Sequence, residues 1–191
     1  MLKLIHLIFA HLSFYIGNAI PGFAFLSNLK IKFYRLSGIK IGDNALIVGP
    51  IKIDYTLTDN VLASINIGTG TYIGRDLRVS SFKSTVTIGN NCQIASDVSL
   101  ETNTHKLNEW SGPLRIRYQK PIVIRDGVWI GARALILPGV TIGENAVVAG
   151  GSVVTNDVPA NTLFGGSPAR FIRHLQPAMT YSFTCLAGIC V

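Results

Sequence analysis

An aliphatic side chain recurs at every sixth position through much of this chain, and that period restricts the folds it can form. The longest run comprises Ile124, Ile130, Ile136, Ile142, Val148 and Val154. Shorter runs precede it: Ile41, Ile47 and Ile53; Ile67, Ile73 and Val79; and Ile88, Ile94 and Leu100. A helix repeats about every 3.6 residues and a strand about every two, so neither produces this pattern. A solenoid with one short straight face per hexapeptide does produce it.

The residues between the aliphatic positions suit the corners of such a solenoid. Four positions after an aliphatic residue the side chain is usually small or β-branched, as at Cys92, Ala134 and Ser152, where we expect core packing. Glycine and asparagine at the bends tolerate the backbone angles of tight turns. Three hexapeptides would close one triangular coil, and coils would stack about 4.8 Å apart through parallel strands. We therefore predict a parallel β-helix over residues 38–174.

The first 37 residues are apolar and do not follow the period. No Lys, Arg, Asp or Glu occurs from Leu4 to Leu29, whereas Lys30, Lys32 and Arg35 follow. A membrane-spanning helix needs about 20 mainly apolar residues, and polar residues and a Pro-Gly pair interrupt this run. We predict two short helices, at roughly 2–17 and 23–36. They either cap the solenoid or lie on a membrane with the three basic residues near anionic headgroups.

Composition restricts the partners only broadly. The chain has 17 basic and 10 acidic residues, a net charge of +7 that favours anionic partners such as phosphates or an anionic membrane. The basic residues are scattered and form no nucleic-acid motif, so we expect no nucleic-acid partner. Its three cysteines are too few and too widely spaced for a disulfide framework. Cys185 and Cys190 lie in the tail, residues 175–191, for which we predict no role.

The period stops at His105, the only histidine between residues 38 and 170. The polar stretch that follows, residues 106–120, reads KLNEWSGPLRIRYQK and predicts a loop extruded from the solenoid. An imidazole accepts a proton from a hydroxyl near neutral pH, so His105 is a candidate general base. The alternative is a histidine that only hydrogen-bonds its own loop.

Several segments resemble the hexapeptide-repeat acyltransferases. They are Asn103-Thr104-His105, PIVIRDGVWIGARALILPGVTIG at 121–143, AGGSVVTNDVP at 149–159, and GGSPAR at 165–170. The similarity is greatest to sugar O-acetyltransferases of the galactoside, maltose and polysaccharide-biosynthesis type, and the apolar N-terminus resembles only the last. The resemblance implies an all-β, left-handed parallel β-helix and a homotrimer with its active site between two subunits. We expect a cytoplasmic protein, associated with the inner face of the membrane if residues 1–36 bind lipid.

The resemblance also implies a reaction and its residues. Acetyl-CoA and a sugar acceptor would bind together, and His105 would take the proton of the acceptor hydroxyl as its oxygen attacks the thioester. Implied contacts to CoA are Trp129, Ala132, Gly150, Thr155, Asn156, Arg170 and Arg173. The two arginines would bind phosphates. Asn156 stands where the family often has a basic residue.

The acceptor side departs from the family pattern. Arg75 and Lys83 stand where galactoside and maltose enzymes place an Asn and an Asp for sugar hydroxyls. Together with Trp110, Arg115 and Arg117 of the loop, they lead us to predict an anionic acceptor. Arg75 and Lys83 are equally compatible with ordinary surface positions.

Two other functions are compatible with a β-helix. A γ-class carbonic anhydrase needs three histidine ligands per zinc site, whereas the coils offer only His105, and we expect no metal. A non-catalytic binding or structural β-helix stays open, because fold does not fix function. Ice-binding solenoids show a flat threonine ladder, and this sequence has no regular one.

Overall fold

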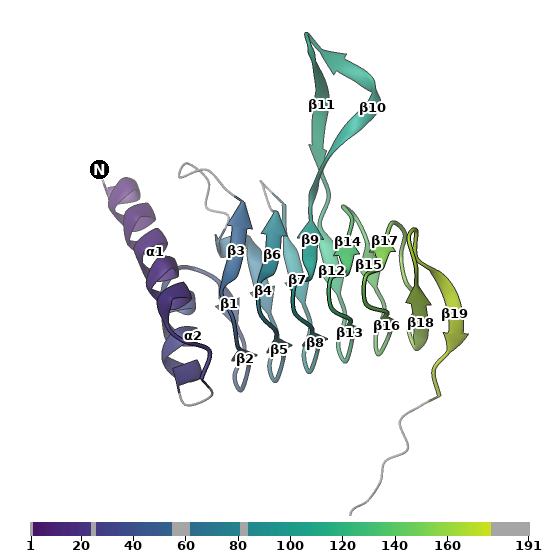
Figure 1. The fold of residues 1–191 in the computed structure, drawn as a ribbon. Coiled ribbons are helices and arrows are strands. Elements are labelled where there is room, and N and C mark those ends of the chain that lie inside the picture. Colours follow the sequence, from purple (N-terminus) through teal and green to yellow (C-terminus); the bar gives the residue numbers. More distant parts are fainter. Residues whose placement is uncertain (1, 24–25, 55–61, 81–83, 177–191) are drawn as a thin grey trace, which may run out of the picture.

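Figure 1 shows a computed structural model of the chain, in which residues 2–23, 26–54, 62–80 and 84–176 are described. Lys83, Cys185 and Cys190 lie outside these ranges. The chain forms a left-handed parallel β-helix with two helices at its N-terminal end, as predicted.

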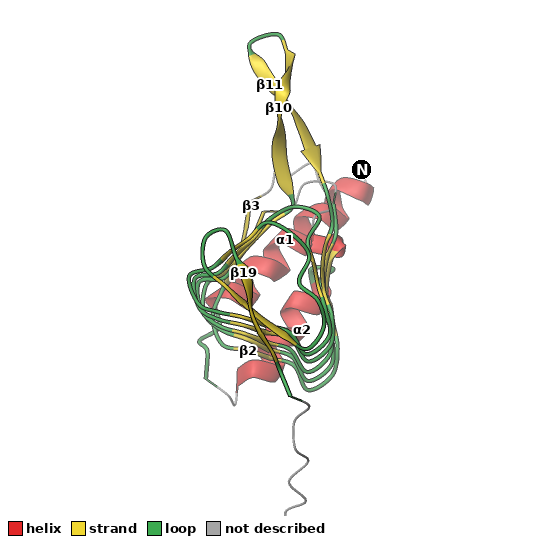
Figure 2. Ribbon diagram, turned by 90° about the vertical axis from the view of Figure 1, so that its right-hand side faces the viewer, coloured by secondary structure: helices red, strands yellow, loops and turns green. Residues whose placement is uncertain are grey.

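Short strands form the three faces of a triangular prism, seen along its axis in Figure 2. Face A contains β1 (Lys40–Ile41), β4 (Ile65–Ile67), β7 (Val86–Ile88), β12 (Ile122–Ile124) and β15 (Thr141–Ile142). Face B contains β2 (Leu46–Ile47), β5 (Tyr72–Ile73), β8 (Gln93–Ile94), β13 (Trp129–Ile130), β16 (Val147–Val148), β18 (Thr162–Gly165) and β19 (Arg170–His174). Face C contains β3 (Ile51–Asp54), β6 (Leu77–Ser80), β9 (Ser99–Glu101), β14 (Leu135–Ile136) and β17 (Val153–Val154). All pairings within the faces are parallel except β18 with β19.

The six-residue ladder fills the interior of the prism. On face B its members are Cα partners in consecutive coils: Ile47, Ile73, Ile94, Ile130 and Val148. Each of them is at most 1% exposed, and Cys92 is fully buried at a corner, as predicted. Because the coils are in register, the residue before each ladder position points outward and forms a second, exposed row.

Left-handed backbone at the corners explains the glycines and asparagines of the repeat. The corner between faces A and B has one positive-φ residue per coil: Asn44, Gly70, Asn91, Gly127, Asn145 and Asn161. A left-handed conformation costs most L-residues about 1–2 kcal/mol, whereas glycine and asparagine tolerate it. The corner between faces B and C uses Asp76, Asp97 and Gly151, and also Arg133 with φ 61°.

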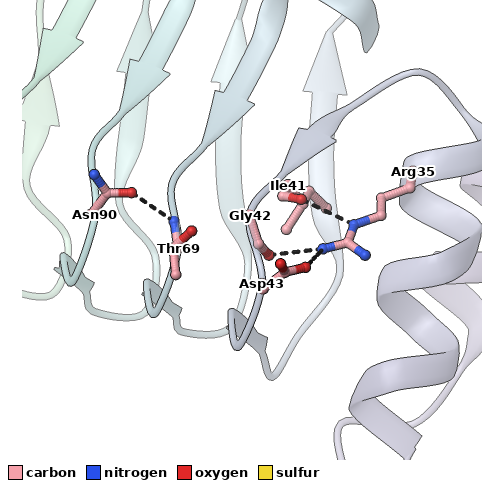
Figure 3. A network of polar contacts seen from close by, with 6 residues as sticks. All are labelled: Arg35, Ile41, Gly42, Asp43, Thr69 and Asn90. Carbon is pink, nitrogen blue, oxygen red and sulfur yellow. Dashed lines mark hydrogen bonds and ion pairs between the residues drawn. The ribbon is translucent and has the colours of Figure 1, made fainter.

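Polar side chains join successive coils along the A–B corner (Figure 3). Arg35 donates to the carbonyl oxygens of Ile41 and Gly42, and its guanidinium lies 3.0 Å from the Asp43 carboxylate. Two coils further on, the side-chain oxygen of Asn90 accepts a hydrogen bond from the backbone N–H of Thr69.

The backbone N–H and the side-chain NH₂ of Asn90 both donate to the Asp126 carboxylate in the next coil. These donors lower the pKa of the Asp126 carboxyl. These polar contacts therefore continue the hydrogen bonding between coils from the strands into the A–B corner.

Helices α1 (Leu2–Ala19) and α2 (Ser27–Leu36) cover the open end of the first coil. A 3₁₀ turn, Leu62–Ser64, precedes β4. The predicted ranges were close, although α2 begins four residues later than expected. The Asn18 side chain replaces a missing neighbouring strand, because it accepts from the N–H of Ile51 (3.0 Å) and donates to its carbonyl (3.1 Å). The buried Tyr34 hydroxyl also donates to Asn18, at 2.6 Å.

The expected place of Lys30 at a membrane surface is wrong. Its side chain is 1% exposed and donates to the carbonyl of Gly49 at 3.2 Å, and burial lowers the pKa of its ammonium group. Since no coil precedes the first one, its terminal carbonyls lack strand partners, and Lys30 supplies a donor. Arg35 is bound to Asp43, so Lys32 is the one of the three that is exposed and forms no ion pair within the described residues.

The segment predicted as an extruded loop is a β-hairpin of β10 (Asn103–Ser111) and β11 (Leu114–Gln119). Gly112, with φ 61°, and Pro113 form its two-residue turn, and a glycine at the first position is typical of type II′ hairpins. The hairpin leaves the corner between faces C and A and projects away from the prism (Figures 1 and 2). The sequence also exceeds its six-residue spacing between β3 and β4 and between β6 and β7, which join the same two faces.

Candidate active site

His105 lies near the base of the projecting hairpin, opposite Arg117 in the antiparallel pairing. Its side chain is exposed, and no hydrogen bond or ion pair joins it to another residue in the described ranges. A catalytic base is normally oriented by a third group. A single copy of the chain therefore presents His105 without the orienting contact that a general base needs.

The hairpin forms a concave pocket of about 770 Å³ on one side of His105. Its other lining residues include Trp110, Arg115 and Arg117. The Arg115 guanidinium lies 4.2 Å from the centroid of the Trp110 ring, a cation–π arrangement that holds both side chains. His105 also lines a second pocket of about 560 Å³, together with Lys106 and Tyr118. The structure thus brings together His105 and three of the predicted acceptor residues.

The predicted CoA residues lie mainly on face B and its border with face C. Trp129 is 52% exposed and belongs to an outward row of Cα partners that continues through Val147 and Leu163 to Arg173. Three strand spacings separate Trp129 from Arg173, about 14 Å. This apolar row with a cation at its end suits an extended pantetheine arm that ends in phosphates.

A β-bulge places both arginines on the same outer side of face B. The register between β18 and β19 shifts at Leu163 and Phe164, so that Arg173 pairs with Leu163 and Arg170 with Gly165. Leu163 and Gly165 are two residues apart in one strand and therefore face the same side. Both arginines are exposed, and neither forms an ion pair within the described residues.

Glycine is required where two coils meet beside Trp129. A Cβ on Gly131 would lie 2.5 Å from the backbone nitrogen of Gly150, which no packing tolerates. Gly151 donates to the Ala132 carbonyl at 2.8 Å in the same contact. Ala132 and Gly150 are thus adjacent at the B–C corner, as a shared CoA contact requires, although the coil alone also explains Gly131.

Other predicted residues lie elsewhere. Arg75 occupies the B–C corner two coils from Ala132 and lines a pocket of about 350 Å³ with Asn18 and Lys30 of the helical cap. Thr155 and Asn156 follow β17 at the C–A corner, on the same side as the hairpin, and their side chains hydrogen-bond to each other. Among the described residues no group of three His, Cys, Asp or Glu side chains is placed to hold a metal ion.

His105 and the row on face B lie on opposite sides of the prism. The hairpin leaves the C–A corner, which is opposite face B in a triangular cross-section, as Figure 2 shows along the axis. The period also indicates two residues that we missed: Tyr72 and Gln93 precede ladder positions and continue the row of Trp129.

A left-handed parallel β-helix with an exposed histidine on an extruded hairpin is the architecture of a hexapeptide-repeat protein. The family model for bacterial transferase hexapeptide (six repeats) matches residues 121–156. A solved hexapeptide-repeat-containing acetyltransferase from Vibrio cholerae is 30% identical, with a TM-score of 0.73 over 88% of this chain and 89% of that one. The chain belongs to the hexapeptide-repeat acyltransferase family.

Other relatives are sugar acetyltransferases. Galactoside O-acetyltransferase of Escherichia coli (strain K12) is 37% identical over 136 residues, which cover 71% of this chain and 64% of that protein. A galactoside acetyltransferase solved in complex with coenzyme A has a TM-score of 0.75 at 29% identity, over 90% of this chain and 81% of that one. The chain spans 44 to 64% of the length of the first curated relatives that it matches.

Proposed function

We propose that this protein transfers an acetyl group from acetyl-CoA to a sugar hydroxyl, in the biosynthesis of a surface polysaccharide. The main support is the exposed His105 ring beside a pocket that also contains Trp110 and Arg115. Related proteins named as galactoside O-acetyltransferases, and one solved with coenzyme A, support the same reaction class.

In the proposed reaction His105 takes the proton from the acceptor hydroxyl while the oxygen attacks the thioester carbonyl carbon. The carbon–sulfur bond then breaks, and the CoA thiolate leaves and recovers the proton from the imidazolium. The acetyl group ends as an ester on the sugar, and no acetyl-enzyme forms. Trp129, Arg170 and Arg173 would hold the CoA moiety through apolar and charge-assisted contacts.

We also propose that each active site combines two copies of the chain in a homotrimer. One copy would provide the hairpin with His105, and its neighbour would provide the row on face B together with Arg75. The position of these groups on opposite sides of one prism supports this arrangement. An unpartnered His105 ring would then receive its orienting contact from the neighbour or the substrate.

The proposed acceptor is anionic, because Arg115 and Arg117 line the pocket beside His105. Arg115→Gln should raise the KM for an acidic sugar about tenfold, the expected cost of losing one charge-assisted contact. Lys106→Gln is the matched control, since Lys106 is paired with Glu109 at 2.6 Å. Equal rates with neutral and acidic sugars would contradict an anionic acceptor and leave the reaction class intact. We place the reaction in the cytoplasm, with residues 1–36 towards the inner face of a membrane.

The direct test measures thiol release from acetyl-CoA across a panel of sugars. His105→Gln should lower kcat at least about 100-fold, the usual contribution of a general base. His6→Gln on α1 is a matched histidine control and should keep wild-type kcat. Normal transfer by His105→Gln would instead favour a non-catalytic role for this histidine.

A further inference from the structure

Helix α1 buries polar side chains and exposes large apolar ones. His11 and Ser13 are 5% and 3% exposed, and they face α2 and the first coil together with Phe14. The exposed side chains are Ile5, Ile8, Phe9, Leu12, Tyr15 and Ile16, which are 38 to 61% exposed. Their spacing of three and four residues puts all six on one side of the helix. We call this side the α1 outer face.

An apolar stripe of this kind normally faces a protein core. Folded soluble chains seldom leave a continuous apolar patch of more than a few hundred Å² in contact with water, and such patches mark surfaces that bind something. Within the described residues the core lies on the other side of α1, and none of them covers the α1 outer face. This face is therefore available to another molecule.

The position of α1 makes this face accessible to a large flat partner. Figure 1 shows α1 as the outermost layer at the N-terminal end of the coil stack, and Figure 2 shows both helices at the end away from β19. The hairpin projects sideways from the middle of the stack, so it does not cover α1. A planar surface can approach the whole length of the helix.

The charges of this end match an anionic surface. Residues 1–43 contain five basic residues and one acidic residue, Asp43, which pairs with Arg35, and Lys30 is buried. Lys32 on α2 and Lys40 on β1 are exposed. Each basic residue near an anionic bilayer contributes about 1 kcal/mol of attraction.

The composition of the face favours lipid over a second copy of the chain. Protein interfaces contain about one hydrogen bond per 100–200 Å² and a polar rim, whereas the only polar atom of the α1 outer face is the Tyr15 hydroxyl. A bilayer interface needs only apolar side chains below and cations beside them, with aromatic rings at headgroup level. No described helix is long and apolar enough to cross a membrane.

We infer that α1 binds the surface of an anionic lipid bilayer, lying parallel to it with Ile8, Phe9 and Leu12 inserted below the headgroups. The test is flotation of the full chain with phosphatidylcholine vesicles that contain roughly 30 mol% phosphatidylglycerol. Wild type should float with these vesicles, more weakly at high salt, and Ile8→Glu/Leu12→Glu should lower the partition at least tenfold. Lys32→Gln should lower it about fivefold.

The matched control is Leu107→Glu, an exposed leucine of the hairpin that should leave flotation unchanged. Phe9→Trp adds a readout that keeps the face apolar, because its emission should shift to the blue when vesicles are added. Circular dichroism and thiol release should be unchanged in the double variant, since both positions are exposed. Failure of the inference would thus leave the proposed acetyl transfer untouched.

Three outcomes would overturn the inference. Wild type could stay with the lipid-free fraction, or the double variant could float as well as wild type. Alternatively, the double variant could change the mass of the oligomer in sedimentation while wild type ignores vesicles, which would identify a second copy as the occupant. If the double variant does not fold, the emission of Phe9→Trp decides between lipid and no lipid.

Discussion

The chain contains two tryptophans, and they occupy opposite sides of the prism. In the proposed reaction Trp129 contacts CoA and Trp110 contacts the acceptor. Trp129→Ala should raise the KM for acetyl-CoA about tenfold with a smaller effect on the acceptor KM, and Trp110→Ala should do the reverse. Initial rates with each substrate varied in turn check this. Equal changes in both KM values for either variant would contradict the division.

Arg133 is the only described residue other than Gly, Asn or Asp with a positive φ. Its side chain is 82% exposed and 4.0 Å from Asp97, an ion pair that contributes little. Arg133→Asn should therefore stabilise the protein by about 0.5–1 kcal/mol, because asparagine tolerates this backbone. Urea unfolding measures the change. The converse substitution, Asn145→Arg at φ 54°, should destabilise by a similar amount, and no change in either would contradict the strain argument.

For individual residues, the sequence predicted burial well. It predicted the contacts of charged and polar side chains less well. The buried ladder follows from the period alone. Lys30 looked like a surface cation, because the lack of strand partners at the first coil is a property of the fold and is invisible in local sequence. The same holds for Asn18, whose role depends on Ile51, 33 positions away.

Among the elements, the helical cap depends on the Asn18 amide. Asn18→Ala removes both bonds to Ile51 and leaves the buried Tyr34 hydroxyl without its acceptor. The expected loss is about 2–4 kcal/mol, because each buried polar group left unpaired costs about 1–3 kcal/mol. Chemical unfolding checks this, with Asn108→Ala on the exposed hairpin as a control expected within about 0.5 kcal/mol of wild type. Similar values for both would show that the cap does not need the amide.

The hairpin shows why one element was predicted in the right place with the wrong structure. Its polar composition hid the pairing, because both faces of a free hairpin meet water and no alternating apolar pattern arises. The signal that was available is Gly112-Pro113 between two stretches of strand-forming residues. For α1 the apolar composition predicted a helix but not its orientation, since the side that packs inward carries the polar His11 and Ser13.

For the whole molecule, the proposed division of the site between copies predicts complementation. His105→Gln and Trp129→Ala/Arg173→Glu should each be nearly inactive. Refolded together at equal amounts, they should recover about a quarter of wild-type activity, because random mixing pairs an intact hairpin with an intact face B in about one site in four. Thiol release measures the recovery.

Refolding each variant alone in parallel is the control for this experiment. A mixture no more active than the sum of its parts would place both halves of the site on one chain. The sequence could not supply this prediction from the period, because which corner the hairpin leaves is known only once the coils are assigned to faces.

One further consequence concerns how such a protein diversifies. The three places where the aliphatic ladder exceeds its six-residue spacing, after β3, β6 and β9, all lie between a strand of face C and the next strand of face A. Insertions there change neither the register of the strands nor face B. A lineage can therefore exchange these segments, and with them the proposed acceptor site, while it inherits the proposed CoA-binding face unaltered. Grafting a hairpin from one relative onto the coils of another is the laboratory version of the same event.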